Sequence, residues 1–144
     1  MSTLEHSAAP SRPAALDAAT LCEAFQLTAA ERPDQVALRT PGAGLEITWA
    51  QYAERVRAFA GGLAALGVRR GDTVGLMTVN RPEFNLVDTA AFHLGAIPFS
   101  IYNTSSLGQV EYLFSNAENR VVGVSVSSLM SSRLPISRMW SMWS

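Results

Sequence analysis

Two glycines in this sequence have the spacing of a phosphate-binding loop. In Gly62-Leu-Ala-Ala-Leu-Gly67, four residues separate them, as in the loop that surrounds nucleotide phosphates. In such a loop, lysine and then serine or threonine follow the second glycine, because an ammonium group offsets phosphate charge and a hydroxyl binds Mg²⁺. Val68 and Arg69 occupy those positions here, and the segment lies within a helical pattern. We therefore expect no phosphate binding there.

Side chains for nucleophilic or acid-base chemistry are scarce. The 144 residues include one cysteine, two histidines and no lysine. Cys22 lies beside an apolar helical stripe with no basic residue nearby in the sequence, so we expect it to pack rather than react. His93 lies between Phe92 and Leu94 in a second helical pattern, and we expect it to be structural. The sequence supports no catalytic, cofactor-binding or metal-binding residue.

Composition narrows the classes of partner. The 11 basic residues, all arginine, and the 12 acidic residues leave a net charge of -1, which favours neither nucleic acid nor anionic lipid. The N-terminus lacks a basic region followed by an apolar run, so it does not resemble a signal peptide. No apolar run approaches the roughly 20 residues that span a bilayer. We expect a cytoplasmic protein without a transmembrane helix.

The N-terminal part predicts a helix followed by a hairpin. Residues 1–16 lack periodicity and are expected to form a mobile leader. A helix should begin with Asp17 as its N-cap and end before Pro33. Its predicted inward residues are Leu21, Ala24, Phe25 and Thr28. Two short strands, 36–39 and 45–48, then flank Pro41-Gly-Ala-Gly44, which is typical of a β-hairpin.

The central part predicts helices that alternate with strands. Thr48 and Gln51 form a capping box before an amphipathic helix that ends at Gly67. Its inward stripe comprises Trp49, Tyr52, Ala53, Val56, Ala60, Leu63 and Leu66. A buried strand over 73–79 precedes a helix with Asn80 as the predicted cap and Glu83 at its third position. That helix is predicted to turn Phe84, Val87, Ala90, Ala91 and Leu94 inward.

The remaining elements complete a β-α-β-α-β order. A strand over 97–101, a helix that starts within 104–106 and a strand over 120–124 follow. This order favours parallel strands joined by helices. The predicted fold class is α/β, with a partial parallel sheet, flanking helices and an N-terminal β-hairpin.

The sequence changes character after Val122. Residues 123–144 are rich in serine, contain no acidic residue and end in Met-Trp-Ser-Met-Trp-Ser. We interpret 17–122 as the folded region and 123–144 as an aberrant, disordered tail, for which a frameshift is the simplest cause. The less favoured alternative is a membrane-binding or partner-binding segment, although the tail has no clear polar helical face.

The folded region resembles the N-terminal subdomain of the adenylate-forming superfamily, and in particular the AMP-forming long-chain acyl-CoA synthetases. The resemblance covers Leu21 to Val122, and the variant Tyr-Asn-Thr-Ser-Ser at 102–106 is more similar to the long-chain fatty acid branch than to other branches. The other segments that carry it are 31–38, 47–52, 66–75, 80–84 and 93–98. In whole members of the family, the segment 102–106 could border an acyl channel, but loop and cap chemistry explains its hydroxyl residues equally well.

The resemblance implies a two-step ligase reaction for the whole family. A fatty acid carboxylate attacks the α-phosphate of ATP, and the thiol of coenzyme A then displaces AMP from the acyl-adenylate. The family's phosphate loop, [ST]-[ST]-G-[ST]-T-G-x-P-K, does not occur after Val122, and its two catalytic lysines have no counterpart in a chain without lysine. We therefore expect no ATP, Mg²⁺ or coenzyme A site in this fragment, and no catalysis by it alone.

Two other functions remain open. A non-catalytic interaction module would complement a separately encoded remainder of the synthetase. A free-standing flavodoxin-like binding domain is disfavoured, because no glycine-rich or hydroxyl-rich phosphate loop follows the first parallel strand.

Overall fold

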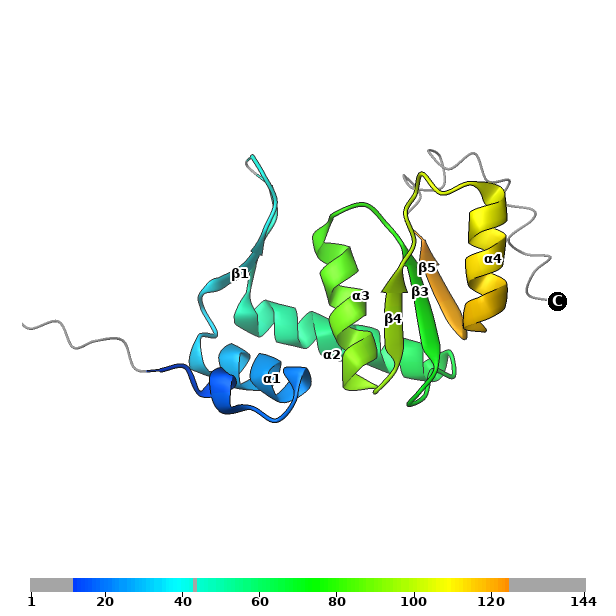
Figure 1. The fold of residues 1–144 in the computed structure, drawn as a ribbon. Coiled ribbons are helices and arrows are strands. Elements are labelled where there is room, and N and C mark those ends of the chain that lie inside the picture. The colour runs from blue at the N-terminus through cyan, green and yellow to red at the C-terminus, as the bar shows by residue number, and fades with distance from the viewer. Residues whose placement is uncertain (1–11, 43, 125–144) are drawn as a thin grey trace, which may run out of the picture.

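The described part of the chain is an α/β unit with a separate hairpin. The computed structural model describes residues 12–42 and 44–124. Figure 1 shows the parallel strands with α3 and α4 on either side of them. The elements are α1 (Leu21–Glu31), β1 (Val36–Arg39), β2 (Glu46–Thr48), α2 (Trp49–Ala65), β3 (Thr73–Met77), α3 (Pro82–His93), β4 (Ile97–Ser100), α4 (Leu107–Ala117) and β5 (Val121–Val124).

Two capping boxes fix the starts of α2 and α4. Thr48 Oγ1 accepts from the Gln51 N–H at 3.3 Å, and Gln51 Oε1 accepts from the Thr48 N–H at 3.0 Å. Ser106 and Gln109 repeat the arrangement at 3.3 and 2.9 Å. Each box satisfies two backbone donors that a helix start leaves free. The predicted cap at Thr48 is therefore confirmed.

Two other predicted caps were wrong. Thr20 rather than Asp17 caps α1, because its Oγ1 accepts from the Glu23 N–H at 3.1 Å. Asp17 instead ends a short 3-10 turn, Ala14–Asp17, and pairs with Arg12 at 2.8 Å. The cap position of α3 is held by Arg81, without a side-chain cap bond. Pro82 with its fixed φ begins that helix instead, which frees the side chain of Asn80.

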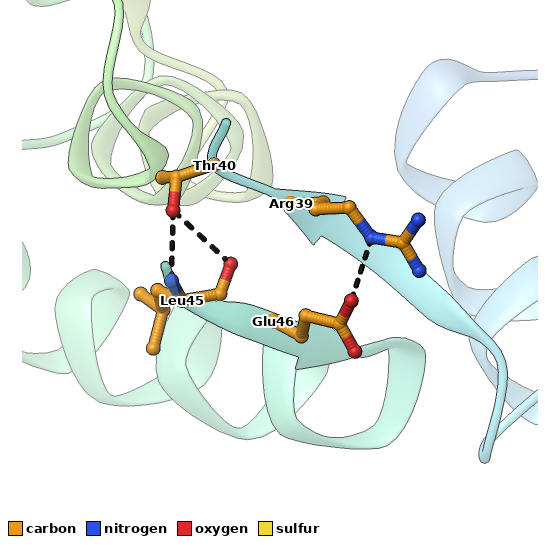
Figure 2. A network of polar contacts seen from close by, with 4 residues as sticks. All are labelled: Arg39, Thr40, Leu45 and Glu46. Carbon is orange, nitrogen blue, oxygen red and sulfur yellow. Dashed lines mark hydrogen bonds and ion pairs between the residues drawn. The ribbon is translucent and has the colours of Figure 1, made fainter. Parts of the chain in front are cut away.

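The hairpin stands apart from the parallel sheet. β1 and β2 pair antiparallel, with Arg39 opposite Glu46. Figure 2 shows the Arg39 Nε to Glu46 Oε1 ion pair at 2.7 Å, beside Thr40 Oγ1, which accepts from the Leu45 N–H at 2.7 Å. Both charged side chains are more than half exposed, so solvent screening makes this pair a small contributor to stability. The predicted hairpin is confirmed.

The parallel sheet has β3 at its centre. The strand order is β4-β3-β5, with Gly75 opposite Phe99 on one side and opposite Val122 on the other. Side chains along β3 alternate between the two faces. Val74 and Leu76 pack under α2 and α3, whereas Met77 packs under α4. The predicted α/β class with a partial parallel sheet is confirmed.

Some predicted inward residues lie at the surface. Leu21, the first residue of α1, is 74% exposed, and Leu66, which directly follows α2, is 65% exposed. Leu86 is buried although it was not among the predicted residues. The residues that follow the predicted stripes correctly include Tyr52, Val56, Leu63, Ala90 and Ala91, all buried in the larger core.

The predicted boundaries of the leader and tail fall largely outside the described residues. Residues 1–11 of the leader and 125–144 of the tail are not described. Within the described part, β5 crosses the predicted boundary at 122 and continues to Val124. The division into 1–16, 17–122 and 123–144 stays a prediction.

Candidate functional site

A crevice opens where the chain leaves β3 and β4. β3 leads into α3 on one face of the sheet, and β4 leads into α4 on the other. Because β3 and β4 are neighbours, the two outgoing loops diverge above their carboxyl ends. In open α/β sheets, ligands bind in the crevice that such a divergence creates. This position makes the crevice the candidate site.

The crevice is lined by uncharged residues from the end of β4, the two loops and the first turn of α3. Its volume is about 520 Å³. Ser100 and Ile101 continue β4 into the site, and the Ile101 N–H donates to the Leu76 carbonyl at 2.8 Å, which holds the two strand ends together. The other lining residues are Thr78, Val79, Asn80, Phe84, Tyr102 and Asn103.

Polar groups in the crevice wall favour hydrogen bonding over charge neutralisation. Thr78 Oγ1 is buried and has no hydrogen-bond partner among the described residues, a state that costs about 1–3 kcal/mol. Asn80 lies at the rim, with its amide not engaged as a cap, and Tyr102 is 80% exposed at the opening. Hydroxyl and amide groups can donate hydrogen bonds to a ligand, including a phosphate, but they carry no formal positive charge that would neutralise a triphosphate.

The wall offers no acid-base pair and no activated nucleophile. None of its eight residues is His, Cys, Asp, Glu, Lys or Arg. Elsewhere in residues 12–42 and 44–124, no cluster of three or more His, Cys, Asp or Glu side chains is arranged to hold a metal ion. The arrangement in this part of the chain is therefore suited to binding and positioning.

His93 joins helices rather than facing the crevice. Its Nδ1 lies 2.8 Å from the Thr89 carbonyl oxygen, which only accepts, so Nδ1 carries the hydrogen. Its Nε2 then accepts from Gln26 Nε2 at 3.0 Å, and its ring meets Phe25 edge-on with centroids 5.3 Å apart. These contacts link α3 to α1 and match the structural role expected from the sequence.

The other residues considered in the sequence also lie away from the crevice. Cys22 is half-buried and lines a small cavity with Phe25 and Phe92. Gly62 lies within α2 and Gly67 follows it with φ of 91°, so the segment with loop-like spacing is a helix and its C-terminal turn. Of the segment 102–106, Tyr102 and Asn103 reach the crevice and Ser106 caps α4.

Two titratable groups are perturbed on the α2 and α3 side of the sheet. Burial raises the pKa of the half-buried Asp88 carboxyl. Burial also raises the pKa of Tyr52, opposed by its hydrogen bond to Thr89 and reinforced by the charge of Asp88. The Tyr52 hydroxyl lies 2.8 Å from Thr89 Oγ1 and donates to the Asn85 carbonyl at 3.1 Å, so its role is to tie α2 to α3.

The profile of the AMP-binding enzyme family matches residues 25–137. The chain belongs to this family. The match covers most of the chain and continues past Val122, beyond the resemblance that the sequence analysis delimited. The family assignment made from the sequence is therefore confirmed.

Individual relatives agree with the family assignment. The uncharacterized protein Rv1549 of Mycobacterium tuberculosis is 57% identical over 103 residues, which cover 72% of this chain and 59% of that one. The long-chain-fatty-acid–CoA ligase FadD15 of Mycobacterium bovis is 38% identical over 77 residues, or 54% of this chain and 13% of the ligase. A solved Mycobacterium tuberculosis fatty acyl CoA synthetase superposes with a TM-score of 0.67 at 26% identity, covering 78% of this chain and 23% of that one.

This chain spans only part of each of these relatives. It covers 59% of Rv1549, and less than a quarter of the ligase FadD15 and of the solved synthetase.

No helix within residues 12–42 and 44–124 is long and apolar enough to cross a membrane.

Sequence reasoning missed the crevice, although a signal was present. Each of the two neighbouring strands is followed at its carboxyl end by polar residues, Thr78 and Asn80 after β3 and Tyr102 and Asn103 after β4. The predicted strand over 73–79 placed Thr78 inside a strand, and capping accounted for Asn80. What the sequence did not show was that β3 and β4 are neighbours whose helices lie on opposite faces.

Proposed function

We propose that this chain is the N-terminal portion of an AMP-forming fatty acyl-CoA ligase and that it does not form acyl-adenylate by itself. The family assignment and the fatty acid ligases among its relatives support the first part. Fatty acid, ATP and coenzyme A are the substrates of the whole enzyme in this proposal, and the cytoplasm is its location. The chain's own contribution is a wall of the binding site.

One observation carries the second part of the proposal. The crevice at the strand ends is lined by uncharged residues, and the sequence contains neither a lysine nor the family's phosphate loop. Adenylation develops negative charge on the α-phosphate and on the departing pyrophosphate, which must be offset by cationic groups, Mg²⁺ or oriented backbone donors. The crevice supplies none of the cationic side chains.

Pyrophosphate exchange tests the proposal directly. The purified 144-residue chain is incubated with ATP, Mg²⁺, labelled pyrophosphate and palmitate or a medium-chain fatty acid. We expect no label in ATP above a heat-denatured control. Exchange that is abolished by Tyr102→Ala would contradict the proposal, because it would place adenylation chemistry in the crevice. Palmitate binding without exchange is compatible with a wall of a binding site.

A second function is favoured by the incomplete sheet. β5 has no strand partner on its outer side among the described residues, and an apolar groove lies next to it. These features suit a non-catalytic module that pairs with another polypeptide, as the sequence analysis left open. The two proposals are compatible, since a ligase portion that is inactive alone can act once paired.

A further inference from the structure

The two edges of the parallel sheet differ in their capacity to accept another strand. The Ile97 N–H donates to the Asp72 carbonyl and the Ile101 N–H to the Leu76 carbonyl, each at 2.8 Å. Backbone groups of a strand alternate in direction, so Pro98 lies at a position that faces away from β3. Proline has no N–H to offer there, which is a common way to protect an edge strand from pairing.

The β5 edge has no such protection. The Arg120 N–H donates to the Thr73 carbonyl at 3.0 Å, and Val122 lies opposite Gly75 in the parallel register. By the same alternation, Val122 turns its N–H toward β3, whereas Val121 and Gly123 turn theirs outward. The strand is Val-Val-Gly-Val, without proline or charge. Among the described residues, nothing pairs with its outer side, so it presents an open template for a further strand.

An apolar groove adjoins this open edge. It has a volume of about 690 Å³ and lies between α2 and β5, on the face of the sheet that α2 and α3 cover, with Val87 of α3 in its wall. Phe59 and Leu63 line it from α2, Leu66 from the residue after α2, and Val121 from β5. Phe59 is 41% exposed and Leu66 is 65% exposed, and every lining residue is apolar or glycine. A contiguous apolar surface of this kind marks an interface.

The relatives extend well beyond the part that this chain matches, which supplies a candidate partner for the groove. A solved fatty acyl CoA synthetase matches this chain over 78% of its residues, yet that match is only 23% of the synthetase. The remaining polypeptide must contact the matched unit somewhere on its surface. Among the described residues, the β5 edge and its groove combine an unprotected strand edge with an apolar surface, whereas the crevice carries several polar side chains and the β4 edge carries Pro98.

We propose that the β5 edge and the apolar groove are the docking surface for the remainder of the AMP-binding domain, supplied as a polypeptide whose extended apolar strand adds beside β5. The added strand pairs with the outward backbone groups of Val121 and Gly123, and its side chains fill the space beside Phe59 and Leu66. This rests on the proposed ligase function and names the surface through which the chain would join a complete enzyme.

The test uses a defined probe. The full 144-residue chain is co-expressed with a tagged fragment of FadD15 of Mycobacterium bovis that begins after the segment matched by this chain. We expect the fragment to be recovered in soluble form with the chain bound. Failure of the wild-type chain to solubilise or bind the fragment would overturn the proposal.

A matched pair of variants locates the surface. Phe59→Glu places a charge in the groove, and Phe92→Glu makes the same change on α3, outside it, at nearly the same exposure of 40%. Because a carboxylate is costly to bury at an apolar interface, Phe59→Glu should lower capture of the fragment roughly tenfold or more. Phe92→Glu should bind as the wild type does. Equal loss in both variants would overturn the assignment of the surface.

Amide hydrogen exchange tests the added strand separately. In the free chain, the N–H groups of Val121 and Gly123 should exchange rapidly, whereas that of Val122 should be protected by β3. In the complex, all three should be protected. Rapid exchange of Val121 and Gly123 in the complex would overturn strand addition.

Other occupants give distinguishable results. Self-association of the free chain that Phe59→Glu abolishes, without capture of the fragment, would assign the groove to a second copy and overturn the proposal. Binding of palmitate that Phe59→Glu abolishes, again without capture, would assign it to an acyl chain and also overturn it. Pyrophosphate exchange by the free chain would instead contradict the proposed function, whatever the groove binds.

Discussion

The two faces of the parallel sheet differ in how much buried apolar side chain covers them. Among the described residues, eleven buried residues form the core under α2 and α3, and three form the core under α4. Leu76 and Met77 are consecutive in β3 and each is 1% exposed, yet they belong to different cores. One strand thus supports two layers of unequal size.

The difference predicts unequal local stability. α2 and α3 pack against each other as well as against the sheet, and the Tyr52 hydroxyl bonds across them. α4 contributes one buried residue, Val110, and otherwise packs through half-buried side chains such as Leu113 and Phe114. Segments with few buried contacts open at lower free energy than the whole domain. We therefore expect α4 to open while α2 and α3 remain folded.

The largest expected effect comes from shortening the side chain of Leu76, which β3 contributes to the larger core. Leu76→Ala should lower the free energy of unfolding by about 3–5 kcal/mol, because the surrounding residues are fixed on all sides and leave a cavity. A small domain has a total stability of about 5–15 kcal/mol, and an incomplete sheet places this one toward the lower end. The variant would keep at most about 2 kcal/mol of stability, so thermal unfolding followed by circular dichroism should show a transition that begins near 25 °C.

Met77→Ala is the matched change on the other face. Half-buried neighbours such as Phe99 and Leu107 can move into the space, so the loss should be about 2–3 kcal/mol. The far-UV spectrum should persist at 25 °C, with faster hydrogen exchange in α4. If Met77→Ala proves as damaging as Leu76→Ala, the two faces are equally important to the fold and the comparison fails.

The sequence predicted the order and type of the elements but not every boundary. The stripe at Tyr52, Val56 and Leu63 was correct because α2 is long and its period is strong. The prediction that Leu21 points inward was wrong, because a residue at the end of a helix stays exposed when no neighbouring element covers it. The prediction of Asn80 as the N-cap of α3 was wrong. The segment Asn80-Arg-Pro-Glu83 is compatible with more than one start of the helix, and in the structure Pro82 is the first helical residue, so Arg81 holds the cap position.

The candidate crevice required information that local patterns do not contain. Thr78 and Tyr102 are 24 positions apart in the sequence, and they share a crevice only because β3 and β4 are neighbours. The place of the apolar groove likewise could not be predicted from local patterns, since it depends on which strand lies at the edge of the sheet. Which edge is open depends on Pro98 and on the strand order.

An intermediate effect is expected from a matched pair of valines. Val56 on α2 and Val110 on α4 are 2% and 3% exposed. Replacing either with alanine removes two methyl groups, worth about 1–2 kcal/mol at roughly 0.8 kcal/mol per group. Val56→Ala should lower the Tm of the whole domain. Val110→Ala should shift Tm less and raise the exchange of α4 amides, as native-state hydrogen exchange can measure.

Equal shifts in Tm for the two valine variants, with no selective exchange in α4, would show that the α4 layer unfolds only with the rest of the domain. The two cores would then behave as one cooperative unit in spite of their different sizes.

The smallest expected effect concerns a charge at the larger core. Burial raises the pKa of Asp88 on α3, so its ionised form is less favourable in the folded chain than in the unfolded chain. The stability linked to this group is therefore fully present below the ordinary carboxyl pKa of 3.8 and is lost as pH rises through the raised value. Asp88→Asn removes this penalty and should raise Tm slightly at pH 7 while leaving it unchanged near pH 3. Glu54→Gln, at an exposed carboxylate on α2, controls for the change in net charge. An Asp88→Asn variant that is less stable than the wild type at pH 7 would contradict this prediction. It would mean that the Asp88 carboxylate makes a favourable contact, and that a charge beside the larger core is stabilising although burial there should disfavour it.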